Sequence, residues 1–149
     1  MAKRIKITVV GSGYVGMSLS VLLAQHHDVT VLDIDATRVD KINNRQSTVA
    51  DTEIELFLAE KSLSLTATLD MQAAYEGASF ILVATPTNYD SDTNRFDTSS
   101  VDAVVEDALT LNLDALVVIK STIPVGHTKA LQEKFKTDRV VFSPEFLRE

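Results

Sequence analysis

The stretch VVGSGYVGMSLSVLLAQ, residues 9–25, places the pattern Gly-x-Gly-x-x-Gly between two apolar segments. The segment before the pattern, residues 5–10, predicts a buried strand, and the segment after its last glycine lacks glycine and proline and predicts a helix. In such a turn Gly11 allows the tight bend, Gly13 lets the backbone approach a pyrophosphate, and Gly16 lets the helix pack on the strand. The pyrophosphate then lies at the helix N-terminus. A glycine turn made for packing alone is the alternative.

An acidic residue, Asp33, follows the second apolar run, residues 29–32. It comes about 20 residues after the glycines, where a carboxylate can accept hydrogen bonds from an adenosine ribose. The alternative is that Asp33 caps the helix predicted over residues 36–43, although Asp35 is better placed for that role. A carboxylate here would repel the extra phosphate of NADP and therefore favours NAD, while Arg38 could receive that phosphate and keeps NADP open.

The bulk composition is that of one soluble globular domain. The chain has 149 residues, of which 45% are hydrophobic and 23% are charged. A net charge of −7 argues against a nucleic-acid partner. Lys3, Arg4 and Lys6 are predicted to be solvated residues beside the first strand. No apolar run is long enough to span a membrane, so we expect no membrane partner and a cytoplasmic location.

Cysteine is absent and histidine occurs three times. The missing thiols exclude disulfides, thiolate metal sites and cysteine nucleophiles within this chain. We therefore predict no metal site.

Strand and helix signals alternate along the whole chain. Strands are predicted at residues 5–10, 29–32, 63–68, 80–84, 116–119 and 140–142. Helices are predicted at residues 14–25, 36–43, 53–60, 70–75, 101–111 and 128–135. The polar stretch 90–100 is predicted to be a mobile loop. This alternation predicts an α/β fold, a single Rossmann-type domain with a doubly wound parallel sheet of order 3-2-1-4-5-6.

Small polar, proline or acidic residues follow five of the predicted strands. They are the glycine turn, Asp33, the run 85–87 (Thr-Pro-Thr), the run 120–124 (Lys-Ser-Thr-Ile-Pro) and the run 143–145 (Ser-Pro-Glu). Each loop alone has the composition of an ordinary turn. Because the carboxyl ends of parallel strands share one edge, the five together predict a ligand crevice there.

Four segments together resemble the UDP-glucose 6-dehydrogenase family, part of the UDP-glucose/GDP-mannose dehydrogenases, and most of all its short bacterial members. They are GSGYVG at residues 11–16, ATPTNY at 84–89, KSTIPVG at 120–126 and SPEFLRE at 143–149. The resemblance spans the whole chain in order, and the last two segments are far more specific than the glycine pattern.

The resemblance implies roles for individual residues. The residues implied in NAD binding are Gly11, Gly13, Tyr14, Val15, Gly16, Asp33, Arg38, Thr87, Thr122 and Glu149. Those implied in lining the UDP-sugar site are Glu145, Phe146, Leu147, Arg148 and Glu149. Thr122 and Glu145 match residues that position a water for hydrolysis and are the catalytic candidates, since a hydroxyl and a carboxylate at neighbouring strand ends can hold and deprotonate a water. The alternative is that Glu145 caps a helix and Thr122 closes a turn.

The reaction that the resemblance implies is a double oxidation of UDP-glucose to UDP-glucuronate with NAD, through a cysteine thioester that water releases. This chain has no cysteine, and it stops at Glu149, where the family continues into a long helix and a nucleotide-sugar domain. We therefore expect residues 1–149 to be the NAD-binding domain of such an enzyme, which binds NAD weakly, turns over nothing alone and forms a homodimer at full length. The alternatives are a free-standing NAD-binding module and a domain of a UDP-N-acetylmannosamine or GDP-mannose dehydrogenase.

Overall fold

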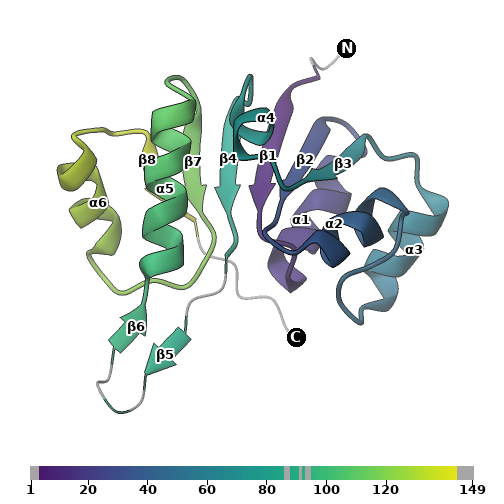
Figure 1. Ribbon diagram of the computed structural model, residues 1–149, viewed down its shortest axis with the longest axis horizontal. Helices are drawn as coiled ribbons and strands as arrows, with labels where there is room; N and C mark the ends of the chain where they lie inside the picture. The colour runs from purple at the N-terminus through teal and green to yellow at the C-terminus, as the bar shows by residue number, and fades with distance from the viewer. Residues whose placement is uncertain (1–3, 86–87, 91, 93–94, 144–149) are drawn as a thin grey trace.

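Six parallel strands form a single sheet in the computed structural model, which describes residues 4–143 except 86, 87, 91, 93 and 94, and except the side chains of 88–90 and 95–97 (Figure 1). The strands are β1 (Lys6–Val10), β2 (Asp28–Leu32), β3 (Leu65–Thr68), β4 (Phe80–Val83), β7 (Leu116–Ile119) and β8 (Val140–Phe142). Their order is β3-β2-β1-β4-β7-β8. The predicted order is confirmed, and the chain reverses its winding direction between β1 and β4.

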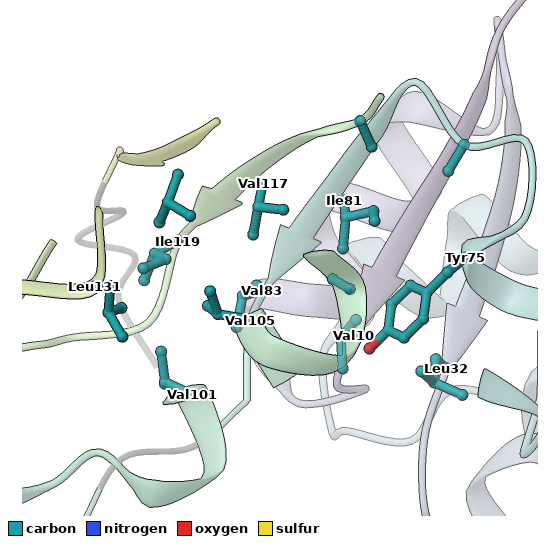
Figure 2. Packing of buried hydrophobic residues seen from close by; sticks show 14 of the residues in the cluster. Val10, Leu32, Tyr75, Ile81, Val83, Val101, Val105, Val117, Ile119 and Leu131 are labelled. Atoms are coloured by element: carbon teal, nitrogen blue, oxygen red, sulfur yellow. The ribbon is translucent and has the colours of Figure 1, made fainter. Parts of the chain in front are cut away.

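Helices cover both faces of this sheet. They are α1 (Tyr14–Leu23), α2 (Ala36–Asn43), α3 (Thr52–Glu60), α4 (Met71–Tyr75), α5 (Ser99–Leu111) and α6 (His127–Phe135). Alternate strand residues point to opposite faces. Ile7 and Val9 therefore pack in one buried cluster with α1, α2 and α3, whereas Val10 packs in a second cluster with α4, α5 and α6. Figure 2 shows part of the second cluster.

The helix starts follow the capping residues of the sequence. Asp35 accepts hydrogen bonds from the backbone N–H groups of Thr37 and Arg38 at the start of α2, as predicted. Asp51 and Asp70 cap α3 and α4 in the same way. A side-chain acceptor at this position satisfies a helix N–H that has no intrahelical partner.

The predicted loop 90–100 is partly wrong, and so is the loop expected directly after β4. An antiparallel hairpin pairs β5 (Asn88–Asp90) with β6 (Arg95–Asp97), and it lies beyond the carboxyl end of β4 (Figure 1). In the sequence each of these strands has one aromatic residue between two polar ones. That alternation favours a strand, but it is only three residues long and is hidden by the polar composition around it.

Lys6 was expected to be a solvated residue, and it is only partly exposed. It lies in β1, and its Nζ donates hydrogen bonds to the backbone oxygens of Ala73 and Glu76 at 2.8 and 2.6 Å, at the end of α4. Burial lowers the pKa of the Lys6 ammonium below its ordinary value. Arg4 is exposed, as predicted, and pairs with Asp28 at 2.7 Å, whereas Lys3 lies outside the described residues.

Strand register brings the carboxyl ends of the sheet into line. Val10 pairs with both Leu32 and Val83, and Val83 pairs with Ile119, which pairs with Phe142. The residues that follow these strands therefore lie along one edge of the sheet, where ligands bind in open α/β sheets.

Candidate functional site: the carboxyl edge of the sheet

The three glycines of the turn between β1 and α1 have different surroundings. Gly11 has φ +105°, and a Cβ placed on it would lie 2.6 Å from the backbone oxygen of Ala84. A Cβ on Gly16 would lie 2.2 Å from the backbone oxygen of Gly11. By contrast, a Cβ on Gly13 would meet nothing within 4 Å. The first and third glycines are therefore needed for packing, whereas the second leaves open space beside the turn.

That open space adjoins the start of a helix. Gly13 is the N-cap of α1, and the first turn of this helix contains no acidic residue. The positive end of the helix dipole therefore faces the space without a nearby carboxylate from its own first turn. Tyr14 and Val15, both implied in NAD binding, lie in this first turn and are partly exposed.

The carboxylate of Asp33 is held beside the glycine turn. Its Oδ2 accepts hydrogen bonds from the backbone N–H of Ser12 at 3.1 Å and from the Ser12 hydroxyl at 2.5 Å. Its Oδ1 accepts a hydrogen bond from the backbone N–H of Asp35 at 3.0 Å. A carboxylate offers about four lone-pair sites, so Asp33 is oriented by these donors and retains acceptor capacity for a ribose hydroxyl.

Ser12, which the sequence interpretation left without a role, connects this end of the site. Ser12 as a whole is 1% exposed. Its backbone oxygen accepts hydrogen bonds from Arg38 Nη1 at 3.1 Å and from Thr48 Oγ1 at 2.5 Å. Arg38, the residue that kept NADP open, is thus turned toward Ser12. Nothing in the sequence pattern singles out Thr48, because it lies in an irregular segment after α2.

The loops that follow β4 and β7 are joined by Ser121. Its hydroxyl donates a hydrogen bond to the backbone oxygen of Thr85 at 2.5 Å, and Ser121 is 8% exposed. Thr122, the next residue, is exposed at the same edge. The ammonium of Lys120 lies 3.1 Å from the hydroxyl of Ser143, so the loop after β7 also contacts the end of β8.

A second contact fixes the loop after β7 from its other end. His127 begins α6, and its Nε2 lies 2.6 Å from Oδ1 of Asp102 in the first turn of α5. Thr98 Oγ1 donates to the other oxygen of Asp102 at 3.2 Å. This contact joins the start of α5 to the start of α6.

Six of the residues predicted for the site lie outside the described part of the structure. They are Thr87, Glu145, Phe146, Leu147, Arg148 and Glu149. The proposed pairing of Thr122 with Glu145 therefore stays a prediction. Among the residues that are described, His, Asp and Glu side chains form no group of three or more that could hold a metal ion. The described helices include none with the length and apolar character needed to cross a membrane.

Comparison with known proteins gives a family match over residues 5–149, to the UDP-glucose/GDP-mannose dehydrogenase family, NAD binding domain. A UDP-glucose 6-dehydrogenase of Streptococcus pneumoniae is 55% identical over 144 residues, which are 97% of this chain and 36% of that protein. One of Campylobacter jejuni is 43% identical over 97% of this chain and 37% of its own length. This chain therefore spans about a third of the length of these relatives.

Solved structures agree with this fold. A UDP-D-ManNAc dehydrogenase from Pyrococcus horikoshii superposes with a TM-score of 0.86 at 25% identity, over 97% of this chain and 37% of the other. A UDP-glucose dehydrogenase from Pyrobaculum islandicum superposes with a TM-score of 0.80 at 25% identity, over 99% of this chain and 37% of the other.

Proposed function

The chain belongs to the UDP-glucose/GDP-mannose dehydrogenase family as its NAD-binding domain, and from that premise we propose that it holds NAD for the oxidation of UDP-glucose to UDP-glucuronate within a longer protein. The observation that carries the proposal is the glycine turn, where two glycines are required by packing and Gly13 borders open space at a helix N-terminus. When bound, NAD accepts the electrons that leave the sugar alcohol.

The residues of the carboxyl edge take separate parts in this proposal. Backbone N–H groups at the start of α1 bind the pyrophosphate, and the oriented carboxylate of Asp33 accepts the adenosine ribose hydroxyls. Arg38 acts through Ser12, to which it donates. Thr122 and Glu145 hold the water for hydrolysis, and the segment 145–149 lines the sugar site, as the resemblance implies.

UDP-glucose is proposed over the other nucleotide sugars because of sequence similarity. The two UDP-glucose 6-dehydrogenases share 55% and 43% of aligned residues with this chain. The UDP-glucose and UDP-D-ManNAc dehydrogenases of known structure each share 25%. Steady-state kinetics of the longer protein on UDP-glucose, UDP-N-acetylmannosamine and GDP-mannose tests this choice. A higher kcat/KM on either of the other two sugars would contradict it.

The proposed cofactor site is tested by replacing its glycines one at a time. Gly13→Ala adds a methyl group into open space at φ −78°, which alanine readily adopts. We expect an unfolding free energy within about 1 kcal/mol of that of the wild type, because the lower chain entropy of alanine is opposed by its poor fit at an N-cap. We also expect loss of NAD binding, measured by calorimetric titration.

The matched control is Gly16→Ala, in which the new methyl group would meet the backbone oxygen of Gly11 at 2.2 Å. We expect this variant to lose about 2 kcal/mol of stability, in the range typical of overpacking. A Gly13→Ala variant that binds NAD as the wild type does would contradict the placement of the pyrophosphate at this turn.

We also propose that the 149-residue chain does not complete the reaction by itself, since it contains no cysteine to form a thioester. No UDP-glucuronate should form when the chain is mixed with NAD and UDP-glucose, because water releases it from the thioester. The longer protein is proposed to be a cytoplasmic homodimer that supplies glucuronate for polysaccharide biosynthesis. Analytical ultracentrifugation of that protein tests the dimer.

A further inference from the structure

The backbone oxygen of Ser12, in the glycine turn, accepts hydrogen bonds from two side chains. Arg38 Nη1, in α2, donates to it at 3.1 Å, and Thr48 Oγ1, in the segment after α2, donates to it at 2.5 Å. The resemblance implies a part in NAD binding for Arg38 and none for Thr48. The contact between Thr48 and Ser12 suggests one.

The other polar atoms of Ser12 are held by a different residue. Its backbone N–H and its hydroxyl both donate to Oδ2 of Asp33. These contacts fix the Ser12 side chain and the peptide before Ser12. The peptide that links Ser12 to Gly13 is anchored separately, because its oxygen is the atom that Arg38 and Thr48 contact.

The orientation of the Ser12–Gly13 peptide decides where the N–H of Gly13 points. A peptide group is planar and trans, so its C=O and its N–H point in opposite directions. With the oxygen turned toward Arg38 and Thr48, the N–H of Gly13 points away from both. In the described part of the chain this N–H donates to no other group. Gly13 is partly exposed and borders open space, so a ligand can reach it.

Gly13 also begins α1. Its backbone oxygen accepts the first hydrogen bond of the helix, from the N–H of Met17 at 2.9 Å. The N–H groups at the start of a helix have no intrahelical partner and can bind an anion together. The N–H of Gly13 adjoins these groups, so the orientation of one peptide affects the whole set of donors.

Thr48 is well suited to anchor this peptide because its own segment is fixed. The Ser47 hydroxyl donates to the backbone oxygen of Val49 at 2.6 Å and accepts from the N–H of the same residue at 3.2 Å. Val49 packs against the buried cluster under α1, α2 and α3, and Asp51 caps α3. Arg38 has a longer side chain, and its Nη1 is shared between the backbone oxygen and the hydroxyl of Ser12.

We infer that Thr48 is a positioning residue of the proposed NAD site: its hydroxyl holds the oxygen of the Ser12–Gly13 peptide and thereby directs the Gly13 N–H toward the pyrophosphate. The inference rests on the proposed function and deepens it, since Thr48 acts through Ser12 and does not touch the cofactor. A donor that already points in the required direction need not be ordered when the ligand binds, which favours binding.

The test removes the hydroxyl alone. Thr48→Val keeps the branched side chain, and we expect the NAD Kd, measured by calorimetric titration, to rise about fivefold, as for loss of one ordinary hydrogen bond. The Kd for adenosine, measured by NMR titration, should stay within about twofold of the wild-type value, because adenosine has the ribose but no phosphate. Thr48→Ser keeps the hydroxyl and should bind NAD within about twofold of the wild type.

Ser47→Ala is the matched control. It removes a hydroxyl from the same segment, but the hydrogen bonds of that hydroxyl go to Val49 and not to Ser12. It should leave the NAD Kd within about twofold of the wild-type value. The inference would be overturned by a Thr48→Val variant with the wild-type NAD Kd, by an equal loss of NAD affinity in Ser47→Ala, or by an equal loss of adenosine affinity in Thr48→Val.

The wild-type chain gives a second readout that does not depend on any variant folding. In the isotope-labelled chain, saturating NAD should shift the amide NMR signal of Gly13, and saturating adenosine should leave it in place. A Gly13 signal that bound NAD does not shift would overturn the inference, while the proposed binding of NAD would stand. A wild-type chain that binds no NAD would overturn both.

Discussion

Asp33 is the residue on which we propose that the choice between NAD and NADP depends. Its carboxylate is fixed by Ser12 and Asp35, and it retains acceptor capacity at the end of β2. Arg38 donates to the backbone oxygen of Ser12 at 3.1 Å. With the acid presented to the site and the arginine directed at Ser12, the arrangement favours a free ribose hydroxyl over a 2′-phosphate.

Asp33→Asn should reduce the ratio of the affinity for NAD to the affinity for NADP. Loss of the negative charge weakens the hydrogen bond to the ribose, since bonds to charged groups contribute about 1.5–3 kcal/mol. We therefore expect the NAD Kd to rise at least about tenfold, while NADP loses less affinity because its phosphate is no longer repelled. Calorimetric titrations with both dinucleotides measure the ratio.

Asp35→Ala serves as the control for this experiment. Asp35 caps α2 and lies two residues from Asp33. Its loss should lower the unfolding free energy by about 1 kcal/mol and leave the NAD to NADP ratio as it is. An Asp33→Asn variant with the wild-type ratio would show that the selectivity lies elsewhere.

At the scale of elements, Asn112 joins two turns at the edge of the sheet opposite the candidate site. It follows α5 and is 8% exposed. Its Nδ2 donates to the backbone oxygens of Tyr75 and Ala78 at 2.7 and 2.9 Å. Its Oδ1 accepts from the backbone N–H groups of Asp114 and Ala115 at 2.9 and 2.8 Å. The single amide thus connects the end of α4 with the starts of β4 and β7.

Asn112→Ala should destabilise the domain strongly. Removal of the amide leaves the backbone oxygen of Ala78 and the backbone N–H groups of Asp114 and Ala115 without this partner, at about 1–3 kcal/mol for each group that water cannot reach. The backbone oxygen of Tyr75 keeps a hydrogen bond from the N–H of Ala78 at 3.3 Å. We expect a loss of about 3 kcal/mol in the unfolding free energy, measured by urea denaturation.

The comparison variant is Asn43→Ala. Asn43 makes a similar pair of hydrogen bonds with the backbone of Ala67 but is exposed, so water can replace it. We expect a loss of about 1 kcal/mol. If the two variants lose the same unfolding free energy, burial does not account for the contribution of the Asn112 contacts.

The elements that the sequence predicted well are those with a local signal. The bounds of α2 follow from Asp35 and from a regular apolar spacing, and the strands of the sheet follow from continuous apolar runs. The β5–β6 hairpin was missed because each strand is only three residues long. The hydrogen bonds of Asn112 were not predictable either. In two of them the partner lies more than thirty residues away in the sequence.

The same distinction holds within the candidate site. Gly11, Gly13, Gly16 and Asp33 form a spaced pattern, and the structure brings them together at one edge. The contact between Thr48 and Ser12 spans 36 residues and has no pattern. Thr85 Oγ1 is a buried hydroxyl at the end of a strand. Its burial depends on packing between distant segments, so it is visible only in the folded chain.

At the scale of the whole molecule, the proposed NAD site is built from both halves of the sheet. The glycine turn and Asp33 follow β1 and β2, whereas Thr87 and Thr122, which the resemblance implies in NAD binding, follow β4 and β7 in the sequence. The strand order was predictable from the alternation of elements, because right-handed crossovers on both sides of the first strand leave few other arrangements. A ligand that crosses this junction contacts loops from both halves of the sheet. It should therefore stabilise the two halves together.

Saturating NAD should therefore raise the stability of the whole domain as one unit. At a free concentration of about 100 times Kd, mass action adds about 2.7 kcal/mol to the unfolding free energy. Amide hydrogen exchange should then slow about a hundredfold both at Val9 and Val31 in the first cluster and at Val83 and Ile119 in the second, for amides that exchange through global unfolding. Gly13→Ala should abolish the effect in both clusters. Slowing confined to the β1–β2 half would mean that the two halves open separately and that bound NAD stabilises only one of them. The roles assigned to the β4 and β7 loops would then be wrong.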